Sequence, residues 1–285
     1  MPPPLAPHTP PTPTPTTPAV LQPTLKPRPE ITHVVFDFDG TLSWVRHGWP
    51  EIMQSVFASH WVGPESEGVA QRYSIFNSII IGMNGRPTIL QMERFALLLA
   101  ERGLKLDPEA LRAEYQARLD LEIQQRLALI RSNQTPPDAF VVHGGRPLLE
   151  WLSRERLELI ILSSTVEHRV REEAEALGLT HFFKDRIYGS GDNPSAFSKI
   201  TVFEKILRED GVSGENVLSF GDGPVEIACT KTIGGLAIAI CSDETDNGSG
   251  KMDPAKQAQL LEAGADAAYP DFRDIPSLMK YLLQK

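Results

Sequence analysis

The sequence predicts an α/β fold built on a parallel, doubly wound sheet. Two observations carry this prediction: short aliphatic runs recur from residue 31 onward, and the intervals between most of them have helical patterning. Strands that are covered on both faces read as continuous apolar runs, and parallel strands need crossover segments, which are usually helices. A third observation, a long helical interval after the first run, adds an insertion to this fold.

The predicted strands are short and rich in Val, Ile, Leu and Ala, as strands covered on both faces should be. They cover residues 33–37, 157–163, 186–189, 217–220, 236–241 and 266–269. The predicted helices that accompany them cover residues 147–156, 166–177, 200–209, 225–232, 254–262 and 275–283. This alternation of strand and helix is typical of a parallel sheet with helices on both faces.

The long interval over residues 44–137 offers helices and no convincing strand. Asp107, Pro108 and Glu109 form a good helix start, with an N-cap, a proline at the first helical position and an acid in the first turn. Helices are expected over 51–60, 67–81, 89–102 and from 107 to about 131. We therefore predict a core of residues 30–43 and 138–285, interrupted by a helical domain over 44–137.

The first 29 residues have a different composition from the rest of the chain. They hold 12 of the 24 prolines, no acidic residue, and only Lys26 and Arg28 as bases. Proline lacks a backbone donor, and the segment has too little apolar area to fold alone. We predict an extended, disordered tail over residues 1–29. Its composition also fits a ligand for a proline-recognition domain, but the partner is unknown.

Composition excludes several classes of protein. With 41% hydrophobic and 23% charged residues, the chain is neither wholly disordered nor collagen-like. Outside the tail, 26 Lys and Arg face 37 Asp and Glu, so the acidic body lacks the electrostatic signature of a nucleic-acid binder. No apolar run reaches the length of a membrane span, and no secretory signal begins the sequence. The two cysteines are too few for a disulfide framework. From these three observations together we expect a cytoplasmic protein with no membrane partner.

The strongest chemical signal is the run Asp37-Phe38-Asp39-Gly40-Thr41, directly after the first predicted strand. Alternate residues of a strand share a face, so Asp37 and Asp39 emerge on the same side, roughly 6 to 7 Å apart. Open α/β sheets bind ligands at the carboxyl ends of their strands, which is where this pair lies. Taken alone, such a pair is more often a polar turn with two solvated acids.

Further polar residues follow other predicted strands. Asp222 comes after the strand over 217–220, and Ser163 with Ser164 ends the strand over 157–163. Lys199 begins a predicted helix. Each has a simple structural explanation, as a turn residue, a helix cap or a solvated charge. Together, and in this order along the chain, they form a set suited to binding phosphate.

At these residues the chain resembles the haloacid dehalogenase superfamily. Its four motifs are an aspartate-x-aspartate strand end, a serine or threonine strand end, a lysine, and a terminal acidic pair. The DFDGT run is the most characteristic piece, and the resemblance extends from about residue 31 to the C-terminus. It implies a Rossmann-like core and, from the place of the insertion, an all-helical cap domain over the site.

The resemblance also implies roles for individual residues. The catalytic residues would be Asp37, the nucleophile, and Asp39, the general acid and base. The phosphate ligands would be Ser163, Ser164 and Lys199. The ligands of a Mg²⁺ cofactor would be Asp37, Asp39 through its carbonyl oxygen, Asp222 and Glu226. The charges agree with this set: a bound monoester with ionised Asp37 and Asp222 carries about −4, against about +3 from Mg²⁺ and Lys199.

Two positions depart from the family pattern. Glu226 stands where aspartate is usual, and its extra methylene leaves direct metal ligation open. Lys199 lacks the common following proline, so Lys184 remains an alternative. The 23-residue separation of Lys199 from Asp222 resembles the family spacing and favours Lys199.

Asp39 favours a phosphatase over a dehalogenase, because the dehalogenases have no aspartate two residues after the nucleophile. We expect a Mg²⁺-dependent phosphatase for a small phosphorylated metabolite, such as a sugar phosphate or a phosphoglycolate-like monoester. A phosphomutase of the same superfamily and a non-catalytic phosphate-binding module remain alternatives. Three residues outside the motifs are candidates for substrate specificity: Arg46, His47 and Arg86.

Overall fold

The computed structural model describes residues 18–63, 67–83, 87–191 and 197–285. Its core is a seven-stranded sheet in the order β1-β7-β6-β5-β2-β3-β4, in which all neighbours are parallel except β1 and β7. The predicted α/β fold is therefore confirmed. The strands are β1 (Val20–Leu21), β2 (His33–Phe36), β3 (Glu158–Val166), β4 (Ile187–Ser190), β5 (Val217–Gly221), β6 (Leu236–Ile240) and β7 (Ala267–Tyr269).

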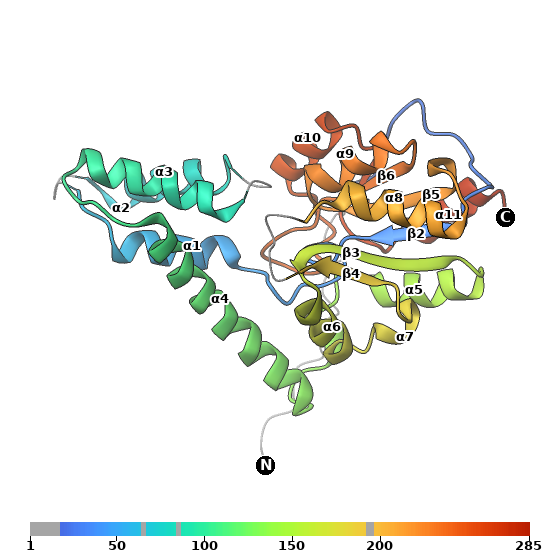
Figure 1. Cartoon of the computed structure of the whole chain (residues 1–285), viewed down its shortest axis with the longest axis horizontal. Helices are drawn as coiled ribbons and strands as arrows, with labels where there is room; N and C mark the ends of the chain where they lie inside the picture. The colour runs from blue at the N-terminus through green and yellow to red at the C-terminus, as the bar shows by residue number, and fades with distance from the viewer. Residues whose placement is uncertain (1–17, 64–66, 84–86, 192–196) are drawn as a thin grey trace, which may run out of the picture.

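Helices cover both faces of the sheet (Figure 1). One face carries α8 (Lys199–Asp210), α9 (Pro224–Thr232) and α10 (Pro254–Glu262). The other carries α5 (Gly145–Arg154), α6 (Glu167–Ala176) and the short α7 (Thr180–Phe183), with α11 (Ile275–Leu283) packed against α5. The six predicted core helices lie within two residues of these bounds, whereas α7 was not predicted.

The central strand β2 is buried on both faces, as its uninterrupted apolar sequence predicts. Val34 and Phe36 join the core on one side of the sheet, and Val35 joins the core on the other. The ring of Phe36 stacks on that of Phe220 in β5, with centroids 5.0 Å apart. This packing fixes the carboxyl end of β2, directly before the predicted nucleophile Asp37.

The insertion consists of four helices in its described part: α1 (Trp49–Ser59), α2 (Val69–Ile80), α3 (Thr88–Glu101) and α4 (Pro108–Arg131). As predicted, Asp107 caps α4 by accepting a hydrogen bond from the backbone of Glu109 (3.1 Å). Figure 1 shows this group to one side of the sheet, with the long α4 returning to the core. There α4 meets α6 through an ion pair between Asp120 and Arg169 (2.6 Å).

The prediction that the whole segment 1–29 is disordered is wrong for its last part. Val20–Leu21 forms β1 and pairs with the edge strand β7, and Leu25 is buried. The backbone of Arg28 also donates to the carbonyl of Leu282 (2.7 Å). The few apolar residues among the prolines gain their order from this edge strand, which local composition cannot reveal. Residues 1–17 lie outside the described part of the chain.

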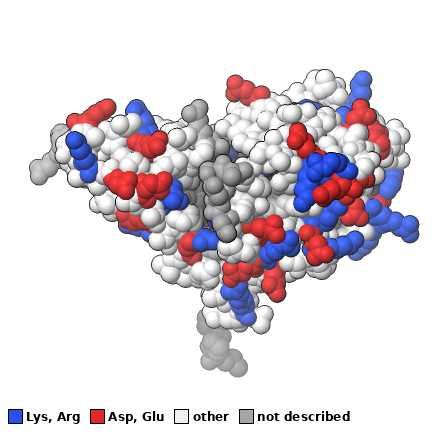
Figure 2. Space-filling view, viewed as in Figure 1, with Lys and Arg blue, Asp and Glu red and all other residues white. Residues whose placement is uncertain are grey.

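The surface reflects the acidic composition of the chain, which has a net charge of −9. On the face shown in Figure 2, acidic and basic side chains are mixed and no broad basic area forms. Within the described ranges, no helix combines the length and the apolar character that a membrane span requires. The long α4 has many charged residues, which suits a helix exposed to water on one side.

Candidate active site

The predicted aspartate pair lies directly after β2, at the centre of the sheet. The backbone N–H of Asp37 donates to the carbonyl of Phe220 (2.9 Å), so the first aspartate still continues the ladder with β5. Gly40 then adopts a positive φ of 72°, which favours glycine. A Cβ at Gly40 would lie 2.1 Å from Oδ2 of Asp222, so the turn also lets the two chain segments approach closely.

Lys199, at the start of α8, contacts the nucleophile position. Its ammonium donates to Oδ1 of Asp37 (2.8 Å) and also to Oε1 of Glu226. The Lys199 side chain is only 2% exposed, so this contact is shielded from solvent. The alternative, Lys184, is an exposed residue after α7 and has no such contact in the described structure. The geometry therefore favours Lys199.

A second lysine, which the sequence analysis did not single out, binds the other predicted metal ligand. The ammonium of Lys256 in α10 donates to Oδ2 of Asp222 (2.9 Å) and is paired with Glu244. Lys256 is 7% exposed in its side chain. Each of the two lysines thus bridges two carboxylates, and the two bridged pairs line one cavity of about 260 Å³ through Asp37, Asp222, Glu226 and Glu244.

This cluster holds four carboxylates and only two lysines, so with all groups ionised its net charge is negative. Burial raises the pKa of Asp37 well above its ordinary value; Lys199 opposes this, while Glu226 and Asp222 add to it. Burial likewise raises the pKa of Asp222, against the effect of Lys256. Burial alone would lower the pKa of Lys256, but Asp222 and Glu244 raise it above its ordinary value. Apart from burial, the neighbouring carboxylates act in one direction at each of these groups: they favour a bound positive charge.

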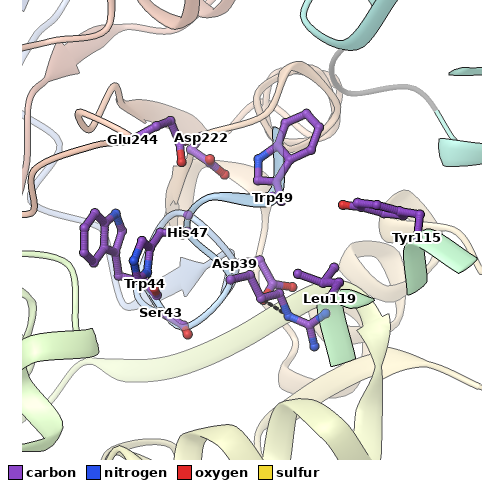
Figure 3. A pocket seen from close by; sticks show the side chains of 11 residues that line it. Asp39, Ser43, Trp44, His47, Trp49, Tyr115, Leu119, Asp222 and Glu244 are labelled. Atoms are coloured by element: carbon purple, nitrogen blue, oxygen red, sulfur yellow. Dashed lines mark hydrogen bonds and ion pairs between the residues drawn. The ribbon is translucent and has the colours of Figure 1, made fainter. Parts of the chain in front are cut away.

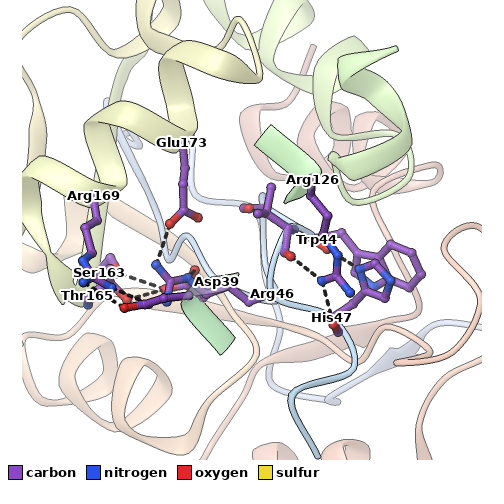
Figure 4. A network of polar contacts seen from close by, with 12 residues as sticks. Asp39, Trp44, Arg46, His47, Arg126, Ser163, Thr165, Arg169 and Glu173 are labelled. Carbon is purple, nitrogen blue, oxygen red and sulfur yellow. Dashed lines mark hydrogen bonds and ion pairs between the residues drawn. The ribbon is translucent and has the colours of Figure 1, made fainter. Parts of the chain in front are cut away.

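Asp39 faces a different set of residues (Figure 4). Its Oδ2 accepts hydrogen bonds from Thr165 (2.7 Å) and Ser163 (3.4 Å), both in the last part of β3. Its Oδ1 lies 2.7 Å from Nε of Arg46. Both carboxylate oxygens of Asp39 therefore have partners, and neither partner set includes Lys199 or Lys256.

Arg46 lies in the segment that leads from the core to α1, and its guanidinium does not face solvent. Besides contacting Asp39, it pairs with Oε1 of Glu173 in α6 (2.5 Å). Burial alone would lower the pKa of Arg46, but these two carboxylates raise it above its ordinary value. Arg46 lines a cavity beside Asp39, yet its charge is already paired. A role in substrate specificity stays a prediction.

That cavity has a volume of about 170 Å³ and lies between the core and α4 (Figure 3). His47 lines it and stacks on Trp44, with ring centroids 3.8 Å apart. Trp49 and Tyr115 supply further aromatic surface, and Figure 3 shows Tyr115 across the cavity from Trp44 and His47. Asp222, Glu244 and Trp49 line both cavities, so the two spaces adjoin.

The two predicted serines have different environments. Ser163 is buried and turned toward Asp39, whereas Ser164 is exposed and lines the cavity that contains Asp37. Only Ser164 is therefore placed to meet a phosphate in that cavity directly. The third candidate for specificity, Arg86, lies outside the described residues.

Comparison with known proteins agrees with this geometry. Residues 31–234 match the model of the family described as haloacid dehalogenase-like hydrolases, which covers more than half of the chain. The chain belongs to this family. No curated protein sequence matches it at a significant level.

Solved structures of haloacid dehalogenase-like proteins share the fold. A Deinococcus radiodurans family hydrolase with bound phosphate and sodium is 15% identical, with a TM-score of 0.60 over 88% of this chain and 96% of the other. A Haemophilus somnus protein described as a predicted phosphoglycolate phosphatase is 16% identical, with a TM-score of 0.58 over 87% and 98%. A Thermotoga maritima protein described as a candidate β-phosphoglucomutase is 18% identical, with a TM-score of 0.57 over 88% and 99%.

The resemblance to this family predicts Mg²⁺ ligation by the side chains of Asp37, Asp222 and Glu226, and the structure shows how they lie. Within the described residues, no three acidic, histidine or cysteine side chains converge as a ready-made metal cluster. Mg²⁺ usually takes only one or two protein carboxylates and completes its shell with water and phosphate oxygens. Asp37 and Asp222 fit that pattern, since both line the same cation-attracting cavity. Glu226 lines the same cavity and, like Asp37, is paired with Lys199, so its direct ligation stays open.

Sequence reasoning missed several polar residues of this site, among them Thr165, Glu173, Glu244 and Lys256. Thr165 lies two residues beyond Ser163, so it shares that residue's face of β3, and a longer predicted strand would have included it. Glu173 and Lys256 lie within amphipathic helices, where a charged residue ordinarily faces solvent. No local signal distinguishes them from exposed charges, because their partners are distant along the chain.

Proposed function

We propose that this hydrolase is a Mg²⁺-dependent phosphatase that acts on a small phosphorylated metabolite through an aspartyl-phosphate at Asp37. The observation that carries the proposal is the arrangement of Asp37 between Lys199 and the cavity that it shares with Asp222. A carboxylate in this place can attack phosphorus only if nearby positive charge offsets its repulsion from the phosphate. Lys199 and a cation held by Asp222 would supply that charge.

In the first step, a carboxylate oxygen of Asp37 forms a bond to phosphorus while the bond from phosphorus to the leaving oxygen breaks. Asp39 enters this step as the protonated acid; the leaving oxygen takes its proton and departs as an alcohol. Thr165 and Ser163 hold one oxygen of Asp39, which fixes its position at the edge of the second cavity. Ser164 would contact the phosphoryl oxygens from the cavity wall, and Lys199 would offset their charge from its place beside Asp37.

In the second step, a water molecule attacks the phosphorus of the aspartyl-phosphate. Asp39, ionised after the first step, accepts a proton from this water. The bond between phosphorus and Asp37 breaks, which regenerates the carboxylate and releases inorganic phosphate. Asp37 and Asp222 are the residues that would hold Mg²⁺, whose charge would stabilise the phosphoryl oxygens.

The cavity of about 170 Å³ supports a small leaving group. Its aromatic surface, from Trp44, Trp49 and Tyr115, suits the apolar face of a sugar ring or a similarly compact group. We therefore propose sugar phosphates and phosphoglycolate-like monoesters as the first substrates to test.

The test is phosphate release from a panel of sugar, polyol, glycolate and nucleotide monophosphates, with and without Mg²⁺. We expect release from at least one small monoester that needs Mg²⁺ and is lost in Asp37→Asn. This variant keeps the size of the side chain, and its circular dichroism would show whether the fold is intact. Wild-type activity in Asp37→Asn would contradict the proposal.

The same panel separates the two alternatives. A phosphomutase would need a bisphosphate activator and would convert one monophosphate into its isomer with little free phosphate. A non-catalytic module would bind a phosphate analogue such as vanadate without hydrolysing any compound. Either result would replace the phosphatase proposal.

A further inference from the structure

Lys256 occupies an unusual place for a lysine. It lies in the first turn of α10, where Asp253 caps the helix by accepting hydrogen bonds from the backbone of Ala255 (2.8 Å) and of Lys256 itself (2.9 Å). The backbone N–H of Asp253 is tied to the carbonyl of Cys241, just after β6 (2.9 Å). The sheet and the cap thus direct this lysine into the site, where its side chain is 7% exposed.

The side chain of Lys256 lines the cavity that contains Asp37, whereas Lys199 is not among the lining residues. Its ammonium is 2.9 Å from Oδ2 of Asp222 and is also paired with Glu244. An ammonium has three donor hydrogens, so one remains after these two contacts. Lys256 is therefore placed to donate a hydrogen bond to a group that enters the cavity.

The charges of the cavity show what this donor does. With all groups ionised, four carboxylates and two lysines give a net charge of about −2, so one bound Mg²⁺ would make the cluster neutral. Without Lys256, the Mg²⁺-loaded cluster would still be negative when a phosphate dianion arrives. Burying a charged pair is also a weak source of stability, so packing alone does not account for this lysine.

We propose that Lys256 is a second phosphate-binding cation of this site, which contacts the phosphoryl oxygens from the side opposite its two carboxylates. The inference rests on the proposed phosphatase function, and it adds a residue outside the four sequence motifs. Lys256 does two things in this account: it fixes Asp222 and Glu244 by ion pairs, and it gives the Mg²⁺-loaded cavity the charge needed to accept a phosphate dianion.

The test is isothermal titration calorimetry of the full chain with two probes, MgCl₂ alone and inorganic phosphate in saturating Mg²⁺. For Lys256→Met we expect the Kd for phosphate to rise by about tenfold or more, as for the loss of a hydrogen bond to a charged group. The Kd for Mg²⁺ should stay the same or fall, because the cavity becomes more negative. Lys256→Arg should keep most of the phosphate affinity.

The matched control is Lys231→Met. Lys231 lies in the last turn of α9 and is paired with Asp266, which directly precedes β7. This variant should bind both probes like the wild type. Unchanged phosphate affinity in Lys256→Met would overturn the inference, as would a parallel loss of Mg²⁺ and phosphate binding that Lys256→Arg does not restore. Absence of phosphate binding by the wild type would instead contradict the proposed function.

A second variant is expected to raise the phosphate affinity instead of lowering it. This test is available even if Lys256→Met fails to fold. Glu244→Gln removes one negative charge from the cavity and leaves Lys256 paired with Asp222 alone. We expect it to bind phosphate several-fold more tightly than the wild type. Weaker or unchanged phosphate binding in Glu244→Gln would contradict the proposal that the positive charge of Lys256 binds phosphate.

Discussion

At the scale of single residues, Glu173 is a buried acid that contacts Asp39 only through Arg46. Its side chain is 2% exposed, and its only described ion pair is with Arg46, which in turn contacts Asp39. Burial raises the pKa of Glu173 to about 7; Arg46 opposes this shift, and Asp39 adds to it. Glu173 therefore links the stability of the protein to pH.

The sign of that link follows from the raised pKa. The folded protein holds the proton of Glu173 more tightly than the unfolded chain, whose carboxyl has an ordinary pKa of 4.5. The resulting stabilisation is complete below pH 4.5 and is lost as the pH rises through about 7. Between pH 5 and pH 8 the free energy of unfolding of the wild type should fall. In Glu173→Gln, whose side chain does not titrate, this fall should be smaller than in the wild type by about 1–3 kcal/mol.

Urea unfolding of wild type and Glu173→Gln at both pH values checks this prediction. Glu172→Gln is the matched control, because Glu172 precedes Glu173 in α6 but is 40% exposed and paired with Arg131. The control should keep the pH dependence of the wild type. The same pH dependence in all three proteins would show that Glu173 does not carry it.

The site could be predicted from sequence only where a residue's place follows from its own strand. Asp37 and Asp222 lie at the ends of strands that local sequence identifies, and the sheet then brings them together. Lys256 and Glu173 reach the site from helices whose orientation is set by contacts far along the chain. Pattern alone cannot tell such residues from solvated charges. Arg46 stays a candidate for substrate specificity, and its pairing with Asp39 and Glu173 is a contact that its sequence does not reveal.

At the scale of elements, the segment before β2 contains an ordered strand, β1, that its proline-rich composition does not predict. Sequence alone located the parallel strands and the helices between them, because each has its own apolar pattern. The segment containing β1 has no such pattern, and it is ordered by its contacts with β7 and α11. Leu25 is its buried anchor at 9% exposure, whereas Leu21 is 53% exposed.

These two leucines make a direct test of that anchoring. We expect Leu25→Ala to lower the free energy of unfolding by about 2 kcal/mol, since it removes a buried side chain. Leu21→Ala, four residues earlier, should change it by less than about 0.5 kcal/mol. Urea unfolding curves of both variants measure the difference. Equal stability of the two variants would show that the segment adds nothing to the core.

At the scale of the whole molecule, Arg126 connects α4 to the segment by which the insertion leaves the core. From α4 it donates hydrogen bonds to the carbonyls of Val45 (2.5 Å) and His47 (2.8 Å), in the segment that leads from the DFDGT motif to α1. This segment also carries Trp44, so Arg126 fixes part of the wall of the smaller cavity. The insertion thereby helps to shape the space for the leaving group.

We expect Arg126→Ala to raise KM by about threefold to tenfold and to change kcat less, since it removes two hydrogen bonds that position the cavity wall. The control is Arg118→Ala, on the same helix, whose contacts are with Ser55, Ser59 and Glu114 within the insertion. Steady-state kinetics on the best substrate of the panel measure both variants. A loss of kcat with unchanged KM in Arg126→Ala would contradict this role.

The central claim, that Asp37 is the nucleophile, is tested most directly by trapping the covalent intermediate. The protein is mixed with p-nitrophenyl phosphate and Mg²⁺, quenched in acid within one turnover and reduced with borohydride, which converts an aspartyl-phosphate to homoserine. The account predicts homoserine at position 37 by peptide mass spectrometry, and none at Asp39 or in Asp37→Asn. Phosphate release with an unmodified Asp37, together with turnover by Asp37→Asn, would contradict it.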